Sequence, residues 1–168
     1  LRSYYYFMLR RKVIPFDPMT KVQALKASKK LPVYVEEKPM EALLNDVEFP
    51  NTFDGIRDKL VLELLYGTGI RLSELIGLKI TDVNLYEKNI TVLGKRNKHR
   101  IVPLTQPLFE LIQQYVQLKD EFFSGQADPT YLIVSDKGIA AYPVLIQRIV
   151  KRHLNVVTTL EKKSPHVL

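Results

Sequence analysis

The sequence predicts a mixed α/β fold, mainly α, in which a small antiparallel sheet (a β-hairpin) packs on helices. Three observations predict it. Apolar residues recur at helical spacing after Asp54 and after Pro107, two short β-prone segments flank a polar turn between those helices, and a further helix opens at Pro143. The resulting order of helix, helix, hairpin, helix, strand and helix is typical of helices covering a small sheet.

Composition narrows the class of protein. The chain has 168 residues, 46% of them hydrophobic and 26% charged, which suits one main domain with a core. No apolar run is long enough to span a bilayer, so no membrane partner is expected. Without Cys or a recognisable leader, a cytoplasmic location is expected. Lys and Arg number 25 against 18 acidic residues, and this net charge of +7 favours a polyanionic partner such as nucleic acid.

The first residues predict the end of one domain and a linker to the next. Aromatic side chains within residues 1–13 fall at helical spacing until Pro15 stops the pattern. The stretch 17–38 is rich in Pro and Lys with weak periodicity, which indicates a linker. We therefore expect 1–16 to be the last helix of a preceding domain, 17–38 an interdomain linker, and 39–168 the N-terminal part of a second domain.

Helical segments are predicted between the linker and the hairpin. Residues 40–47 form a short one, and a longer one begins at Asp54 with an apolar face made of Ile56, Leu60, Val61, Leu64 and Leu65. Gly67 and Gly69 are expected to end this longer helix. Ser73 has the side chain of an N-cap for the next short helix, which covers 73–78.

The second half of the chain supplies the hairpin and the remaining helices. Strands are predicted at 89–93 and 100–104 around a basic turn, and at 131–134 before a turn at 136–138. Pro107 opens a helix with the stripe Leu108, Leu111, Ile112, Tyr115 and Val116. The helix from Pro143 is expected to run to about Val157, and Ser164 with Pro165 reads as the start of another.

Three strings carry a resemblance to a known family. GTGIRLSELIGLKITDVNL at 67–85, VLGKRNKHRIVPL at 92–104 and SPHVL at 164–168 resemble, in order and spacing, signatures of the Xer-type tyrosine recombinases, also called the phage-integrase family. The resemblance implies that family's catalytic-core fold without its C-terminal helices. It also implies that double-stranded DNA is cut and rejoined through a 3′-phosphotyrosine, without metal or nucleotide cofactor, by a homotetramer on two duplexes in the nucleoid.

By this resemblance Arg71 matches the first catalytic arginine of the family. Its planar guanidinium can donate two hydrogen bonds to a scissile phosphate and stabilise the negative charge of the transition state. From the residues alone, Arg71 could instead only pair with Glu74 as an i,i+3 surface pair, contributing about 0.2 to 0.5 kcal/mol. The surrounding motif favours catalysis and makes Glu74 a buried supporting partner.

Lys95, in the turn between the two strands, matches the hairpin lysine of the family. The resemblance makes it the general acid that protonates the 5′ leaving oxygen. The alternative is an ordinary solvated turn. Lys98 and Arg100 are interpreted as contacts to the DNA backbone. On the helix that opens at Pro143, a cationic group is interpreted as further DNA contacts or as a solvated face: Arg148, Lys151 and Arg152.

His166 matches the first histidine of the family's His-x-x-Arg motif, although a frayed chain end is the alternative. The motif's arginine would directly follow Leu168, and none of the nine tyrosines stands where the family has its nucleophile. The chain is therefore expected to bind DNA without cutting it. A metal site is not expected, because the histidines at 99, 153 and 166 share no ligand spacing and Cys is absent.

Two other functions stay open at this point. A non-catalytic DNA-binding module that occupies recombination sites would need the same basic residues. A helical protein-interaction domain with incidental positive charge would differ in one respect, because its affinity for nucleic acid would change little with salt.

Overall fold

The computed structural model describes residues 1–23, 34–94, 98–159 and 163–167, and the chain divides into two compact units, Leu1–Leu31 and Pro32–Leu168. Much of the expected linker, 24–33, lies outside the described residues. In the N-terminal unit, helix α1 spans Arg2–Arg10, and none of its residues is buried. The expected helix is present there, while its assignment to a preceding domain stays a prediction. Among the described residues, no helix combines the length and apolar character that crossing a bilayer requires.

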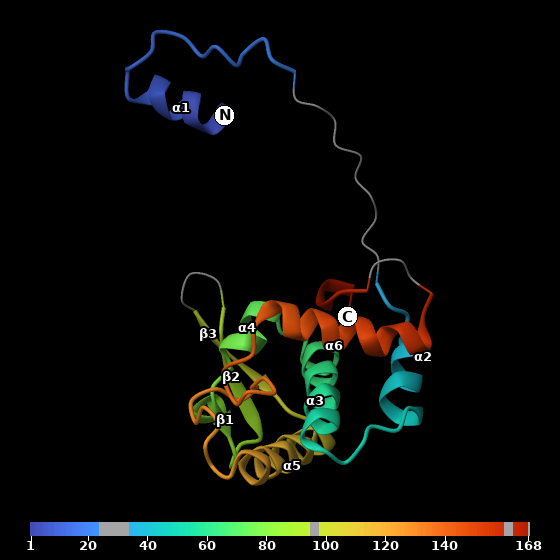
Figure 1. Ribbon diagram of the computed structural model, residues 1–168. Coiled ribbons are helices and arrows are strands. Elements are labelled where there is room, and N and C mark those ends of the chain that lie inside the picture. The colour runs from blue at the N-terminus through green and yellow to red at the C-terminus, as the bar shows by residue number, and fades with distance from the viewer. Residues whose placement is uncertain (24–33, 95–97, 160–162, 168) are drawn as a thin grey trace. The chain divides into compact units, whose positions relative to one another are not determined.

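The C-terminal unit is built around helix α3, Phe53–Thr68, which contacts α5 and α6 (Figure 1). The side chains of Leu60, Val61, Leu62 and Leu64 are fully shielded from solvent, so more of α3 is covered than the single apolar face that its sequence predicts. The surrounding helices are α2 (Glu37–Glu41), the π-helical turn η1 (Ala42–Asp46), α4 (Leu72–Gly77), α5 (Gln106–Phe123) and α6 (Pro143–Val157). The described residues of this unit also form two 3-10 turns, η2 (Ile80–Asp82) and η4 (Pro165–Val167).

A three-stranded antiparallel sheet in the order β1-β2-β3 lies beside these helices. Strand β1 is Val83–Asn84, β2 is Asn89–Leu93 and β3 is His99–Pro103. The predicted hairpin is confirmed within one residue, whereas the two-residue β1 was not predicted because it is too short for an alternating pattern. Ile90 and Val92 of β2 are buried, and this strand contacts α4.

The prediction of a strand at 131–134 was wrong. Tyr131 forms an isolated bridge with Lys79, and the backbone N–H of Val134 donates to the hydroxyl of Tyr115 at 3.2 Å. The segment is apolar because it is buried. Its hydrogen-bond partners come from separate parts of the chain, however, so no continuous ladder forms.

The junction between α3 and α4 differs from the prediction at two residues. Gly67 lies inside α3, and only Gly69, with φ 61°, ends the helix in the left-handed conformation that glycine favours. Ser73 is not the N-cap of α4 but lies within it. Arg71 is the N-cap residue instead, and the carboxylate of Glu74, the third helical residue, accepts the backbone N–H of Arg71 at 2.9 Å, as the acidic member of a capping box does.

Candidate functional site

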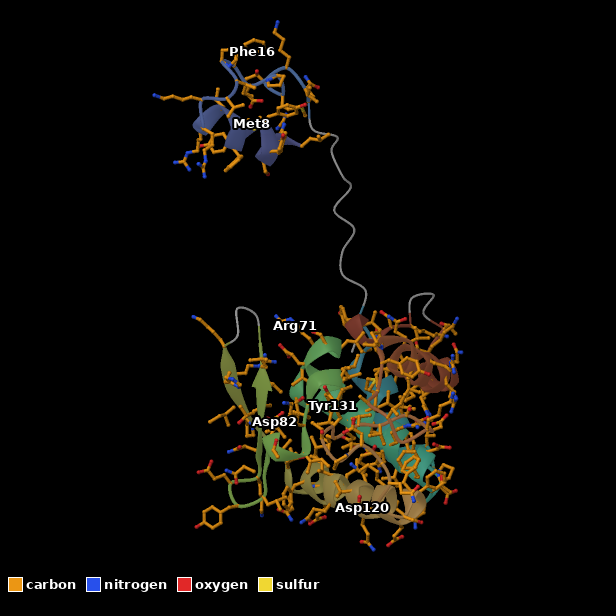
Figure 2. The ribbon with its side chains drawn as sticks, turned by 60° about the vertical axis from the view of Figure 1, so that its left-hand side comes forward. Met8, Phe16, Arg71, Asp82, Asp120 and Tyr131 are labelled. Carbon is orange, nitrogen blue, oxygen red and sulfur yellow. The ribbon has the colours of Figure 1, made fainter. Side chains whose placement is uncertain are left out.

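Arg71 lies at the start of α4, in the short connection from α3. Gly69 turns the chain at the end of α3, and Ile70 is buried with 4% of its surface exposed. Arg71 is then extended, with ψ 155°, and the helix begins at the next residue. Its side chain is 57% exposed, so the guanidinium reaches solvent at this end of the unit (Figure 2).

Glu74 is a buried carboxylate one turn away from Arg71. Its side chain is 3% exposed, and its Oε1 accepts a hydrogen bond from Nη1 of Arg71 at 3.0 Å. The carboxylate also accepts the backbone N–H of Arg71, so one side chain fixes both the backbone and the head group of this arginine. Arg71 therefore makes the i,i+3 pair with Glu74 and still exposes more than half of its side chain.

Arg100 on β3 makes a second ion pair with Glu74. Its Nη1 and Nη2 donate to the two carboxylate oxygens at 2.9 and 2.8 Å, a bidentate geometry. These hydrogen bonds from Arg100 are the largest cause that lowers the pKa of Glu74 to about 2, and Glu74 in turn raises the pKa of Arg100. The sequence suggested a phosphate contact for Arg100, whereas in the structure its head group is engaged by a buried acid.

The hairpin approaches the same carboxylate. Lys95 lies outside the described residues, but Gly94 before it is described, and its N–H donates to the carbonyl of Lys98 at 2.8 Å. A Cβ atom at Gly94 would lie 3.5 Å from Nη1 of Arg100 and 3.8 Å from Oε1 of Glu74. The backbone that leads into the hairpin turn thus passes beside the ion pair, and Lys98 across the turn is exposed.

His166 belongs to η4, whose backbone is described while the histidine side chain lies outside the described residues. Val167 is 2% exposed, and its carbonyl accepts the N–H of Val35 at 2.8 Å. Helix α6 also contacts η4. The backbone at 165–167 is therefore held in place, unlike a frayed chain end.

The other expected cations lie on α6. Arg148 and Lys151 are exposed, and Arg152 is 62% exposed with its Nη1 3.4 Å from Oδ2 of Asp58. Helix α6 contacts α4, and Figure 1 shows both at the end of the unit where the Leu93–His99 side of the hairpin lies, with α5 at the opposite end. The start of α4, the strand ends Leu93 and His99, and helix α6, which between them carry the expected cations, thus lie towards one end of the C-terminal unit.

A buried charged cluster joins α3 to α6, and it was not singled out from the sequence. The Asp58 carboxylate is 3% exposed and accepts from Nε2 of His153 at 3.0 Å and from Nη2 of Arg57 at 3.3 Å. Arg57, with a side chain 4% exposed, also pairs with Asp136, and this hydrogen bond is the largest cause that lowers the pKa of Asp136. Two adjacent charges inside the apolar stretch of α3 were the available signal.

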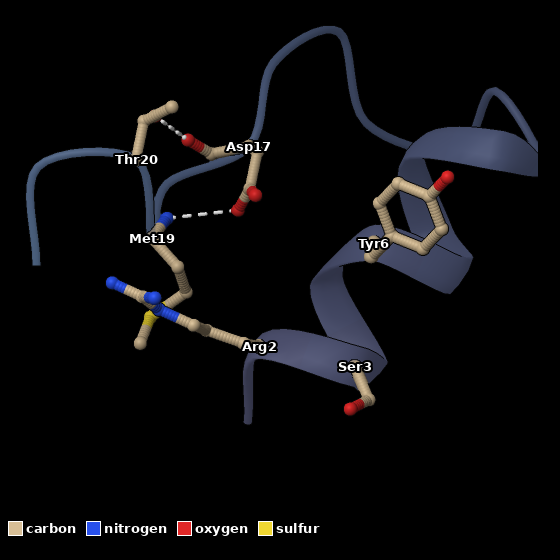
Figure 3. Close-up of a pocket in the computed structure, with 6 residues that line it drawn as sticks. All are labelled: Arg2, Ser3, Tyr6, Asp17, Met19 and Thr20. Atoms are coloured by element: carbon tan, nitrogen blue, oxygen red, sulfur yellow. Dashed lines mark hydrogen bonds between the residues drawn. The ribbon is translucent and has the colours of Figure 1, made fainter. Parts of the chain in front are cut away.

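The N-terminal unit has a pocket of its own, with a volume of about 540 Å³ (Figure 3). Asp17 orders the loop beside it, because its carboxylate accepts the N–H of Met19 at 2.9 Å and its carbonyl accepts the Thr20 hydroxyl. None of the site residues expected from the sequence lines this pocket, whose lining residues are Arg2, Ser3, Tyr6, Asp17, Met19 and Thr20.

Comparison with known proteins gives consistent matches. Residues 33–168 match the family model for the phage integrase family. The chain is 35% identical over 187 residues to tyrosine recombinase XerC of Chlorobaculum parvum, an alignment that covers 100% of this chain and 56% of that protein. The crystal structure of XerA recombinase superposes with a TM-score of 0.68 at 29% identity, covering 86% of this chain and 49% of that one. XerH recombinase, in a post-cleavage complex with its palindromic difH substrate, gives a TM-score of 0.71 at 25% identity, covering 86% and 42%. The chain thus spans little more than half the length of the curated relative.

Proposed function

The chain belongs to the phage integrase family of tyrosine recombinases, and from this premise we propose that it contributes to a site that cuts and rejoins double-stranded DNA through a 3′-phosphotyrosine. One observation carries the proposal. Arg71 is fixed by the buried Glu74 at its backbone and its head group, yet its side chain is 57% exposed. An arginine held in this way at the surface is suited to an anionic ligand. The relative XerH was crystallised with a DNA substrate, which supports the same class of ligand.

Arg71 acts on the scissile phosphate in this proposal. Its N–H groups donate to phosphate oxygens, and they hold the developing negative charge of the phosphorane-like transition state more strongly than the ground state. A fixed donor of this kind contributes about 3 to 4 kcal/mol. Lysine at this position would keep the charge but lose the planar pair of donors.

Lys95 and His166 carry the proton chemistry. Lys95 directly follows Gly94, which lies beside the Glu74 carboxylate, and a lysine ammonium there protonates the departing 5′ oxygen. General acid catalysis of this kind typically contributes roughly 100-fold to 10,000-fold. His166, in the anchored turn η4, assists proton transfer or holds the phosphate.

The cations at this end of the unit bind the DNA backbone. Arg148 and Lys151 on α6 and Lys98 in the hairpin are exposed, and they neutralise phosphates without reading sequence. Arg152 contributes less to DNA binding because its guanidinium pairs with Asp58. Four copies of the complete protein assemble on two duplexes, as the family resemblance implies, in the cytoplasm on the nucleoid.

The 168-residue polypeptide by itself is expected to bind DNA without joining it. The members of a covalent catalytic site act as a unit, so loss of the nucleophile abolishes the reaction rather than slowing it. None of the nine tyrosines in the sequence stands where the family has its nucleophile.

Nicked suicide duplexes drawn from the host genome test the proposal. If the reading frame continues past Leu168, the longer protein that it encodes is expected to form a covalent protein–DNA adduct. Arg71→Gln in that protein is expected to abolish the adduct. The 168-residue polypeptide is expected to form none. An adduct with the short polypeptide would overturn the assignment of the nucleophile. A longer protein that binds the duplexes without any adduct, or a reading frame that stops at Leu168, would favour the non-catalytic DNA-binding module.

A further inference from the structure

Each oxygen of the Glu74 carboxylate accepts hydrogen bonds from both arginines. Oε1 accepts Nη1 of Arg71 at 3.0 Å and Nη1 of Arg100 at 2.9 Å, and Oε2 accepts the Arg71 backbone N–H at 2.9 Å and Nη2 of Arg100 at 2.8 Å. The three side chains therefore form one unit, in which Arg71 and Arg100 touch the same buried acid from α4 and from β3.

The sharing has an electrostatic consequence. A lone Arg71–Glu74 pair would be neutral, and the carboxylate would draw the guanidinium towards itself and away from any outer anion. With Arg100 added, the unit carries a net charge of +1. Arg100 makes the bidentate contact with Glu74, whereas the Arg71 head group makes one bond to it. The remaining positive charge is thus left with Arg71, the more exposed of the two at 57% against 40%.

We propose that Arg100 is a positioning residue, which acts on the scissile phosphate through Arg71 by holding Glu74 and by offsetting its charge. This inference rests on the proposed function, and it differs from the expectation that Arg100 contacts the DNA backbone itself. Arg100 has no need of direct contact with DNA in this role.

The same contact fixes the hairpin. A Cβ atom at Gly94 would meet the carbonyl of Lys98 at 3.3 Å and Nη1 of Arg100 at 3.5 Å, so the backbone before Lys95 lies directly over the Arg100–Glu74 pair. The pair joins residues 26 positions apart in sequence, from α4 and from β3. Through Arg100, strand β3 is tied to helix α4 beside Gly94.

A double-mutant cycle on DNA affinity tests the proposal. The 168-residue chain, its Arg71→Gln and Arg100→Gln variants and the double variant are titrated with a fluorescent duplex of mixed sequence over a range of salt. Each single substitution is expected to weaken binding roughly tenfold, the loss for one charged hydrogen-bonded contact. The double variant is expected to bind no more weakly than Arg71→Gln alone, because Arg100 acts through Arg71. Multiplied losses would show that Arg100 is an independent contact and overturn the proposal.

The DNA affinity of a conservative variant is a second measurement, and a positioning residue and a direct phosphate contact are expected to give different results in it. Arg100→Lys keeps the charge but cannot make the bidentate bond, so it is expected to bind as weakly as Arg100→Gln. Lys88→Arg, the matched control at the turn before β2, is expected to bind as the parent chain does, because Lys88 is exposed and lies at the opposite end of that strand from Gly94. Near-normal affinity of Arg100→Lys would overturn the positioning role. Thermal unfolding of each variant identifies any that fails to fold.

The experiment distinguishes rejection of the proposed function from rejection of the positioning role of Arg100. If the parent chain has no affinity for duplex DNA, the proposed function is rejected and the positioning role with it. If the parent chain binds, Arg71→Gln weakens binding and the cycle shows independent losses, the proposed function stands and only the role of Arg100 is rejected.

Discussion

The Asp58 carboxylate on α3 accepts a hydrogen bond from Nε2 of His153 on α6 at 3.0 Å, across 95 residues of sequence. Arg57, also on α3, pairs with the same carboxylate, and the side chains of Arg57 and Asp58 are each less than 5% exposed. The helix that carries the exposed cations Arg148 and Lys151 is thereby fixed to the central helix by charged groups as well as by apolar packing.

Replacement of Asp58 by Asn is expected to destabilise the fold strongly. It would leave Arg57 buried without its neighbouring carboxylate and would weaken the bond to His153. Breaking a buried pair by removing one partner costs about 3 to 5 kcal/mol, and we expect the lower end because Arg57 retains Asp54 and Asp136. The free energy of unfolding in urea measures the effect.

Arg152→Gln is the matched control for that cluster. Arg152 reaches the same carboxylate but its side chain is 62% exposed, so its loss is expected to change the free energy of unfolding by less than about 1 kcal/mol. Equal effects of the two substitutions would contradict the buried-pair explanation.

Acid is expected to remove the contribution of Glu74 to stability. Its pKa is lowered on folding from the ordinary value of 4.5 to about 2, so the charged carboxylate is favoured in the folded state. The contribution is fully present above about pH 4.5 and is lost as the pH falls through about 2. Urea unfolding of the parent chain and of Glu74→Gln over this pH range is the measurement. The difference in stability between them is expected to shrink towards pH 2, and a constant difference would contradict the lowered pKa.

Two glycines at the end of α3 are expected to respond oppositely to alanine. Gly67 lies inside the helix with open space around it, so Gly67→Ala should raise the free energy of unfolding by up to about 1 kcal/mol. Gly69 has φ 61°, which costs an L-residue about 1 to 2 kcal/mol, so Gly69→Ala should lower it. Thermal midpoints should move in opposite directions by a few degrees, on the order of 2 to 4 °C per kcal/mol. Shifts of the same sign would contradict the observed helix end.

The spacing of apolar residues in the sequence predicted the long helices and the β-hairpin. The helix with the apolar stripe from Leu108 to Tyr115 begins one residue before the expected Pro107, and the helix from Pro143 to Val157 has its expected bounds. Both were predictable because the buried residues of an amphipathic helix recur at a fixed local spacing. Apolar character alone misled at 131–134. Leu132 and Val134 are fully buried, but burial there comes from surrounding segments rather than from a sheet, and no local pattern records that difference.

Of the contacts around the candidate site, the pairing of Arg71 with a buried Glu74 was predicted, and the contacts between distant residues were not. Motifs identified Arg71 and suggested Glu74 as its buried partner, which are one helical turn apart and therefore within local reach. The pairing of Arg100 with Glu74 spans 26 residues, and that of His153 with Asp58 spans 95. Such contacts depend on how α4 meets β3 and how α6 crosses α3, which is set by packing of the whole core.

The exposed cations on α6 are expected to carry salt-dependent affinity for DNA. Arg148→Gln and Lys151→Gln remove exposed charges from α6, the helix that contacts α4, while Lys88→Gln removes one at the turn before β2, at the opposite end of that strand from Gly94. Each phosphate that a side chain neutralises adds about 0.9 to the slope of log affinity against log salt concentration. Titrations of a mixed-sequence duplex at several salt concentrations should therefore show that slope fall by about 0.9 for each α6 substitution and remain unchanged for Lys88→Gln. If both α6 variants keep the slope of the parent chain, α6 is an ordinary solvated face. The DNA would then have to be placed against other residues.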